Sequence, residues 1–356
     1  MAKIIFADVT GHYDGRALET RALGGTESSV ILCAQGLARR GHDVTVHSNC
    51  DAELVHEGVR WRPLSMRPDQ SCDVYVAVQQ PELLGFVPRP KRRVIWVLWG
   101  ANQLRHYKRF WRLWLHPPKP ILMSQAQLRD YWPVLPRRGD ISLIHLPLPE
   151  AVRGRAPLAE PPPRRAVFAS NPQRNLRALV ELWGERILPA LPDAVLDVYG
   201  VNNLKPGDDA WEVWAGTLLP ADPSPQLKAS VRVHLPLPRA QLFEAVREAR
   251  VMLYLGHKCE AFCLSLAEAQ ALGTPAVIAP VAALPERVID GVTGFHRADP
   301  AEFADAAIQL LTDDALWRRQ HLAALELQQG LSIDEYVTRF EAAMLGLPLG
   351  DIATAA

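Results

Sequence analysis

Two glutamates, Glu260 and Glu268, stand eight positions apart in a stretch that is otherwise almost uncharged. An ionised carboxylate accepts several hydrogen bonds and donates none, so a pair of them suits a ligand rich in hydroxyl groups better than a phosphate. The alternative for both is structural. Glu260 would then be a favourable charge in the first turn of a helix, and Glu268 a solvated helix residue.

The elements around the glutamates favour the binding interpretation. The apolar run 251–255 predicts a buried strand, the residues from Leu264 onward predict a helix, and 276–279 predicts the next strand. Ligands of open parallel sheets bind beyond the carboxyl ends of strands, where helix N-termini offer free N–H groups. We therefore expect Glu260 at such an edge. The backbone N–H groups expected beside it are those of Phe262, Cys263 and Leu264.

This spacing resembles the donor-site signature of family 4 glycosyltransferases, which are retaining enzymes of the GT-B fold. That signature is Glu, seven residues, Glu, and then a helix of small residues that ends in Gly-x-Pro. Here it reads Glu260-AFCLSLA-Glu268, followed by AQALGTPAV. The segment 284–295 also resembles the family's next block, and the resemblance extends to 24–47 and 165–200.

The resemblance implies an α/β protein of the GT-B fold, in which two Rossmann-like domains turn parallel sheets toward an interdomain cleft. The alternation of strand and helix patterns favours parallel sheets in its own right. Prolines accumulate at 146–165, which predicts an interdomain linker. The expected parts are an acceptor-side domain at 1–155, a nucleotide-sugar-binding domain at 165–330, and a C-terminal helix at 331–356 that returns to the first domain.

Apolar runs between turn signals locate the strands of both halves. Amphipathic patterns predict helices that follow Thr26, at 239–249, near 301–311 and at 332–344. The expected strands are 3–8, 43–47, 73–78, 94–98, 121–124 and 141–145 in the first half, and 166–169, 195–199, 231–234, 251–255 and 276–279 in the second.

A Gly-Gly-Thr sequence precedes the first long helical pattern, and Thr26 is the expected N-cap. Glycine has no Cβ, so backbone N–H groups there can approach a phosphate or a sugar ring closely. The spacing is not the Gly-x-Gly-x-x-Gly of dinucleotide enzymes. In the resembling family this loop faces the donor diphosphate and the acceptor, which implies that role for Gly25.

Arg174 follows a predicted strand, where its guanidinium suits a diphosphate; the alternative is a surface arginine in a loop. The resembling family has an Arg and a Lys about five residues apart here. Arg174 matches the Lys, and Ser170 stands in place of the Arg. Many family members also carry a catalytic His near the position of Trp99, and neither His12 nor His106 fits that motif.

The resemblance implies transfer of a sugar from a UDP- or GDP-linked donor to a hydroxyl of a saccharide or lipid-linked acceptor, as in polysaccharide biosynthesis, with retained anomeric configuration and no metal. Glu260 would hold sugar hydroxyls, Glu268 the ribose hydroxyls, and Arg174 the diphosphate. A hexosyltransferase is the first hypothesis. The alternatives are a nucleotide-sugar-binding protein that is catalytically weak or silent, and a GT-B nucleotide-sugar epimerase.

The composition excludes some partners. The chain has 39 Lys and Arg against 39 Asp and Glu, so no global charge draws it to nucleic acid. Five cysteines without paired spacing favour a reducing compartment, and we expect a cytoplasmic protein. The N-terminal apolar run is too short for a signal peptide, and no run approaches the roughly 18 residues of a membrane span.

The segment 102–115 combines aromatic and basic residues. A basic amphipathic helix of this kind is typical of peripheral binding to the inner face of a membrane. The alternative is a helix that packs its apolar side on the sheet and leaves its arginines in solvent. On a continuous helix one side would carry Leu104, Tyr107, Trp111 and Trp114 or Leu115, and another would carry Arg105, Lys108, Arg109 and Arg112.

Overall fold

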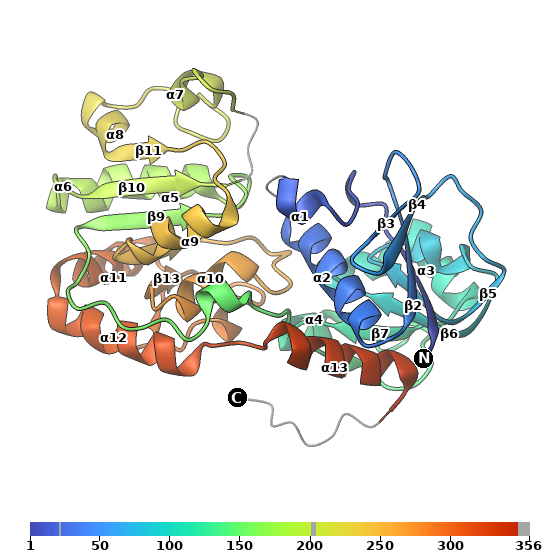
Figure 1. The fold of residues 1–356 in the computed structure, drawn as a ribbon. Coiled ribbons are helices and arrows are strands. Elements are labelled where there is room, and N and C mark those ends of the chain that lie inside the picture. The colour runs from blue at the N-terminus through green and yellow to red at the C-terminus, as the bar shows by residue number, and fades with distance from the viewer. Residues whose placement is uncertain (21–22, 201–203, 348–356) are drawn as a thin grey trace. The chain divides into compact units, whose positions relative to one another are not determined.

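The computed structural model describes residues 1–20, 23–200 and 204–347, apart from the side chains of 107–109. Two compact units make up the chain (Figure 1). Unit 1 consists of Met1–Pro147 and Leu331–Ala356, and unit 2 of Leu148–Gly330. The division after Pro147 falls near the start of the proline-rich segment 146–165, so most of that segment belongs to unit 2.

Unit 1 contains an eight-stranded sheet in the order β3-β4-β2-β1-β5-β6-β7-β8. All neighbouring strands are parallel except β3 and β4, which form an antiparallel pair. The order reverses at β1, so loops that follow β1 and β5 meet at the carboxyl edge. The strands are β1 Lys3–Ala7, β2 Asp43–Ser48, β3 Leu54–His56, β4 Val59–Pro63, β5 Ser71–Val78, β6 Arg89–Trp96, β7 Lys119–Leu122 and β8 Ser142–Leu143.

The antiparallel pair β3 and β4 was not among the expected strands. The alternating pattern that would predict β4 is short, because only Val59 and Trp61 are buried in β4 and the exposed Arg60 separates them. Glu57 and Gly58 form the turn with positive φ angles of 49° and 75°. Gly58 is therefore the residue that favours this hairpin in the sequence.

The long helix of unit 1 begins two residues before the predicted start. Its N-cap is Gly24, in an extended conformation, so the expectation of Thr26 as N-cap is wrong. The Thr26 hydroxyl instead accepts a hydrogen bond of 3.2 Å from the Gln79 side-chain amide. The helices of unit 1 are α1 Ala17–Thr20, α2 Gly25–Arg39, η1 Pro81–Gly85, η2 Ala101–Arg105, α3 Tyr107–Leu115, α4 Gln125–Asp130 and α13 Ile333–Leu345.

Although α13 comes last in the chain, it completes the core of unit 1. Phe340 is fully buried, with its ring centroid 4.9 Å from that of Trp96 and 6.3 Å from that of Phe6. A Cβ at Gly36 would collide with Val337, so the glycine lets α2 and α13 pack closely. Glu341 attaches α13 to the residue before β2, because its carboxylate lies 2.9 Å from His42 Nε2.

The segment 102–115 is two elements rather than one helix. η2 ends before His106, whose backbone is extended, and α3 starts after it. The interruption changes the helical phase, so Leu104 does not share a side with Trp111, Trp114 and Leu115, and the alternative in which that side packs on the sheet is wrong for these three residues. Leu104 and Leu113 are buried, whereas Trp111, Trp114 and Leu115 are exposed. The expected roles of Tyr107, Lys108 and Arg109 lie outside the described side chains.

Unit 2 contains a six-stranded parallel sheet in the order β11-β10-β9-β12-β13-β14. The edge strand β14 was not expected; it is short, and its Gly294 lies so close to Ala276 that a Cβ would collide with the backbone. The strands are β9 Arg165–Ala169, β10 Val195–Tyr199, β11 Val231–Val233, β12 Val251–Tyr254, β13 Ala276–Ile278 and β14 Gly294–His296.

The proline-rich segment follows the surface of unit 2. The Leu158 N–H donates to His321 Nε2 at 2.9 Å, and the Arg155 guanidinium contacts Glu244 at 2.7 Å. His321 belongs to α12, a helix that was not predicted. The helices of unit 2 are η3 Glu150–Val152, α5 Leu176–Leu182 with the π-helical turn Trp183–Ile187, α6 Leu188–Ala190, α7 Ala210–Val213, α8 Pro225–Ser230, α9 Arg239–Arg247, α10 Leu264–Ala271, η5 Leu284–Glu286, α11 Pro300–Thr312 and α12 Asp314–Leu327.

Across the described residues, we find no helix that combines the length and the apolar character needed to cross a bilayer.

Replacement of Phe340 by alanine tests whether α13 is part of the core of unit 1. Because the buried ring contacts two other aromatic rings, Phe340→Ala should lower the free energy of unfolding by about 3–5 kcal/mol. Thr338→Ala, on the exposed side of the same helix, should change it by less than about 0.5 kcal/mol. Urea unfolding followed by circular dichroism measures both. Equal effects would show that α13 adds little to the core.

Candidate functional site

The candidate site lies where the strand order of unit 2 reverses. β9 pairs with β10 on one side and with β12 on the other, so loops that leave β9 and β12 diverge at the carboxyl edge. Parallel α/β sheets bind ligands at this kind of position. The loop after β9 carries Arg174, and the loop after β12 carries Glu260, so the topology brings these two predicted residues together.

Glu260 is held by partners from both loops. Its Oε1 accepts a hydrogen bond of 2.6 Å from the Tyr254 hydroxyl and lies 3.3 Å from Arg174 Nη1. The Tyr254 hydroxyl is also 3.0 Å from Ser170 Oγ. Glu260 is 8% exposed, so these partners compensate a carboxylate that is largely removed from water.

Sequence reasoning missed Tyr254, although a signal existed. It is the last residue of the buried strand β12, and a buried tyrosine hydroxyl usually finds a hydrogen-bond partner. Burial raises the pKa of Tyr254 well above its usual value, and the nearby Cys263 and Glu260 act in the same direction. The phenol therefore stays protonated near neutral pH and serves Glu260 as a neutral donor.

Ser170 stands where the resembling family has an arginine, and its hydroxyl contacts the Tyr254 phenol. The replacement extends a neutral hydrogen-bond chain to Glu260 where a second guanidinium would otherwise stand. Arg174 supplies the guanidinium that contacts this carboxylate.

The loops after β9 and β12 each contain a non-glycine residue whose backbone is in the left-handed conformation. Asn175, with φ 63°, precedes α5, and its side-chain amide donates to the carbonyl of Gly256 at 2.6 Å. Cys263, with φ 66°, precedes α10, so the N–H groups of the first helical turn start at Leu264. Non-glycine residues in this conformation cost about 1 kcal/mol or more and accumulate at functional sites. The strain at Cys263 sets the direction of the backbone at the predicted donor-binding residues.

Packing of the Phe262 side chain also holds the backbone of 262–264 in place. The Arg287 guanidinium carbon lies 4.3 Å from the centroid of the Phe262 ring. Burial lowers the pKa of Arg287 to about 10, which still leaves it charged at neutral pH. Burial also raises the pKa of the Cys263 thiol to about 12, so this residue is neutral. The backbone of 262–264 is therefore held by packing as well as by hydrogen bonds.

Glu268 does not join the cluster around Glu260 through any described hydrogen bond. It is 8% exposed on α10 and pairs with Arg239, the first residue of α9. The alternative of a solvated helix residue is thus wrong. Burial raises the pKa of Glu268, and the charge of Arg239 opposes this. Arg239 was not predicted. The sequence feature that could have identified it is its position where the loop after β11 enters α9.

Gly25, the remaining predicted site residue, is the first residue of α2 in unit 1. Glu27, in the first turn of α2, places a carboxylate at this helix end. Its oxygens lie beside Gly11 and Gly24, where an added Cβ would be 2.6 Å away. The role of Gly25 beside a diphosphate stays a prediction.

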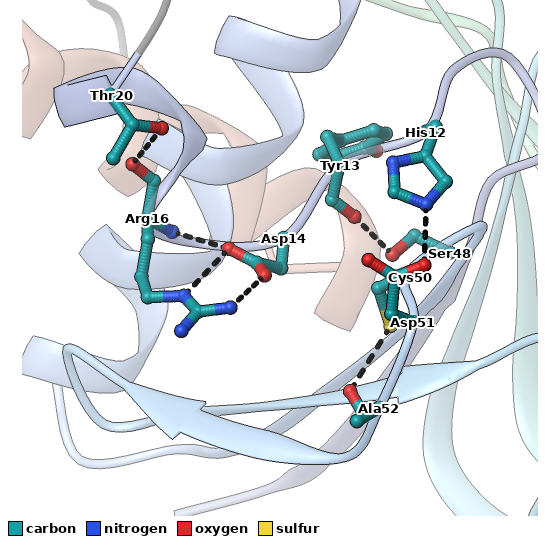
Figure 2. A network of polar contacts seen from close by, with 9 residues as sticks. All are labelled: His12, Tyr13, Asp14, Arg16, Thr20, Ser48, Cys50, Asp51 and Ala52. Carbon is teal, nitrogen blue, oxygen red and sulfur yellow. Dashed lines mark hydrogen bonds and ion pairs between the residues drawn. The ribbon is translucent and has the colours of Figure 1, made fainter.

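The neighbouring loop after β1 is fastened to the loop after β2, as Figure 2 shows. Ser48 Oγ donates to the Tyr13 carbonyl at 2.7 Å, and His12 Nε2 lies 3.0 Å from Asp51 Oδ1. The Tyr13 hydroxyl donates to the fully buried Asp8 at 2.5 Å. Hydrogen bonds therefore join the loops after β1 and β2 at the carboxyl edge of the first sheet.

Trp99 occupies the region where many members of the resembling family carry a histidine. Its carbonyl accepts a hydrogen bond of 2.5 Å from Gln127, and its ring packs against the buried apolar cluster of unit 1. An indole N–H only donates, so Trp99 offers no general base.

Within the described ranges, no three His, Cys, Asp or Glu side chains are grouped to hold a metal ion, and all five cysteines are free thiols.

The raised pKa of Glu268 predicts a pH-dependent stability. A carboxyl whose folded-state pKa exceeds its unfolded value of about 4.5 favours folding at low pH, and this contribution is lost as pH rises through the folded pKa. The unfolding free energy of the wild type should therefore fall relative to Glu268→Gln as pH rises above 4.5. Urea unfolding between pH 4 and 8 measures the difference, with the exposed Glu326→Gln as control. A difference that grows in favour of the wild type would contradict the assignment.

Part of unit 2 matches a known family. Residues 164–313 match the family model described as glycosyl transferases group 1. The segment contains Arg174, Glu260, Glu268 and the strained backbone at Cys263. The predicted site residues of unit 2 therefore all lie within the matched segment.

Curated relatives have names of the same class. The chain is 37% identical over 109 residues to a D-inositol 3-phosphate glycosyltransferase of Thermobifida fusca, which covers 30% of this chain and 25% of that protein. With the corresponding protein of Corynebacterium diphtheriae it is 41% identical over 98 residues, 27% of this chain and 23% of the relative. The match spans about a quarter of the length of these relatives.

Solved structures share the fold over almost the whole chain. A sucrose-phosphate synthase from Thermosynechococcus elongatus superposes with a TM-score of 0.71 at 15% identity, over 96% of this chain and 98% of that one. Anabaena HepE in complex with UDP and glucose gives 0.72 at 14% identity, over 98% and 100%. WaaG, a glycosyltransferase of lipopolysaccharide biosynthesis, gives 0.68 at 14% identity, over 99% and 100%. The protein has the GT-B fold.

Proposed function

We propose that the protein is a retaining hexosyltransferase that transfers a sugar from a nucleotide-sugar donor to an acceptor hydroxyl. The observation that carries the proposal is the contact of Glu260 with Arg174 at the point where the strand order of unit 2 reverses. Both residues lie in the segment that matches glycosyl transferases group 1.

The contacts suggest how the donor binds. Glu260 Oε1 is occupied by Tyr254 and Arg174, so its remaining acceptor capacity is available to sugar hydroxyls. A bound diphosphate would draw Arg174 toward itself, because a guanidinium binds two phosphate oxygens at once. Glu268, steadied by Arg239, would accept the two ribose hydroxyls.

We propose that leaving-group stabilisation comes from the protein rather than from a metal ion. Arg174 and the first N–H groups of α10, from Leu264 onward, would share the charge that develops on the departing diphosphate. The resemblance to family 4 supports both this feature and the retained configuration at the anomeric carbon. Gly25 and the loop after β1 would serve the acceptor side.

The preferred donor is a UDP-linked sugar. Anabaena HepE, which shares the fold, has been solved with UDP and glucose. A GDP-linked sugar is the second choice. The acceptor would be a saccharide or a lipid-linked saccharide, as WaaG acts in lipopolysaccharide biosynthesis. A cytoplasmic location with peripheral membrane contact through 102–115 completes the proposal.

Substitution of Glu260 and Arg174 tests the transfer directly. Glu260→Gln removes the charge that orders the site and should lower transfer from a UDP-sugar by at least about 100-fold, and Arg174→Gln by a similar factor. Arg177→Gln, three residues away, should retain activity, because Arg177 pairs with Glu181 on α5 and donates to the Gly216 carbonyl rather than to Glu260. Sugar transfer in the presence of EDTA is measured by mass spectrometry, because we propose that no metal takes part.

The same assay separates the alternatives. A wild type that binds UDP-sugars in a thermal-shift assay but transfers to no acceptor would be a binding protein, and the proposal would be wrong. An epimerised donor formed without an acceptor would identify an epimerase. Normal turnover by Glu260→Gln would refute the role of that residue.

Tyr254→Phe tests the neutral donor to Glu260. The loss of one hydrogen bond to a charged group should cost about 1.5 kcal/mol, so kcat/KM should fall roughly tenfold. Tyr131→Phe is the matched control, since Tyr131 is also buried and its hydroxyl has no hydrogen-bond partner among the described residues. If both variants behave alike, the Tyr254 hydroxyl plays no part in the site.

A further inference from the structure

One surface of unit 1 exposes large apolar side chains in a group. Trp111, Trp114 and Leu115 on α3 are 46%, 59% and 61% exposed. Trp132 and Val134, in the loop after α4, are 40% and 55% exposed. We call these five residues the aromatic face.

Ring contacts show that α3 and the loop after α4 form one surface. The ring of Phe110 lies 6.2 Å from that of Trp114 and 5.9 Å from that of Trp132, measured between centroids. The Arg112 guanidinium carbon lies 4.1 Å from the Trp111 ring. Three tryptophans with a guanidinium among them have the composition of an interfacial membrane anchor rather than of an ordinary exposed helix.

A hollow of about 670 Å³ opens at the amino ends of β6 and β7, and the last turn of α13 forms part of its wall. It lies at the edge of the first sheet opposite the loops of the candidate acceptor side, because the strands are parallel. One acidic side chain, Asp140, lines it. We call this cavity the basic hollow. The basic residues that line it are Lys91, Arg92, Arg93, Lys119 and Arg138.

Much of this positive charge is not neutralised by the described contacts. Lys91 pairs with Asp73 at 2.7 Å, but Lys119 donates to a backbone carbonyl, that of Asp140. Arg93 likewise donates to a carbonyl, and its Nε is buried without a partner. Burial lowers the pKa of Arg93, and the charge of Arg138 acts in the same direction. A bound anion would relieve this repulsion.

Two chain segments connect the aromatic face to the basic hollow. α3 ends at Leu115, and Lys119 follows only four positions later. The loop after α4 carries Trp132 at one end and Arg138 at the other. His116 follows α3 directly; burial lowers its pKa, and the charges of Arg93 in the hollow and Arg112 on α3 lower it further.

We propose that the aromatic face and the basic hollow together form a docking site for a bilayer of anionic phospholipid. The headgroup phosphate would enter the basic hollow, and Trp111, Trp114 and Leu115 would enter the interfacial layer beside it. A soluble anion would need the cations but not the three exposed tryptophans, and an apolar protein partner would not need the cations. The inference rests on the membrane contact proposed above and is independent of the donor site.

Vesicle co-sedimentation tests the docking site, with vesicles of phosphatidylcholine alone or with 30 mol% phosphatidylglycerol, at about 0.1 M salt. The wild type should bind the anionic vesicles and not the neutral ones. Arg92→Gln combined with Arg138→Gln should weaken binding roughly 30-fold, since each cation near an anionic surface contributes about 1 kcal/mol. Trp111→Ala combined with Trp114→Ala should weaken it about tenfold or more.

The matched controls lie in unit 2. Leu327→Ala removes an apolar side chain that is 52% exposed, and Arg186→Gln removes an exposed cation; neither should alter binding. Circular dichroism verifies that every variant is folded. Equal losses in the control variants would overturn the proposal, as would wild-type protein that remains in the supernatant.

Two further measurements identify the occupant. If glycerol 3-phosphate at millimolar concentration binds the wild type, and the aromatic variant still binds vesicles normally, the hollow takes a free phosphate and the membrane proposal is wrong. If sedimentation velocity shows that the aromatic substitutions dissociate a dimer, the face binds a second copy and the proposal is also wrong. Sugar transfer to a soluble acceptor should be unchanged in these variants, so failure here is distinct from failure of the proposed transferase.

Discussion

The site depends on a buried carboxylate whose charge is compensated from two directions. A carboxylate that is only 8% exposed needs nearby donors, because burying an uncompensated charge is costly. One donor, Tyr254, ends the strand that precedes it, and the other, Arg174, comes from the loop after β9. The adjacency of β9 and β12 in the sheet is what brings these donors together, so the topology of unit 2 and the electrostatics of the site form a single constraint.

In unit 1 the main constraint is the close packing of helices and side chains at glycines rather than the compensation of a buried charge. Gly36 allows α13 to contact α2, and the Glu27 carboxylate lies beside Gly11 and Gly24 at the start of α2. The aromatic core around Phe340 then joins the last helix to the first strand. The edges of its sheet differ: hydrogen bonds fix the loops at the carboxyl edge, whereas the amino edge collects cations.

The sequence allowed prediction of features that depend on local pattern or on a short motif. The central strands, α2, α9, α10 and α13, the position of Arg174 and Glu260 in loops after parallel strands, and the GT-B fold belong to this group. Tyr254 and Arg239 were missed because their roles depend on partners that only the fold brings near. The place of Leu104 on the same side as the residues of α3 was wrong because the extended backbone at His106 interrupts the helical period, which composition does not reveal. The Thr26 cap failed because Gly24 satisfies the helix start through its backbone alone.

The carboxylate at the start of α2 has a consequence for acceptor choice. A helix N-terminus is ordinarily attractive to anions, but Glu27 places a negative charge there. If the acceptor approaches this helix end, a phosphorylated one would meet repulsion and an uncharged polyol would not. At this helix end the charge of Glu27 would therefore favour an uncharged hydroxyl compound over a phosphorylated one.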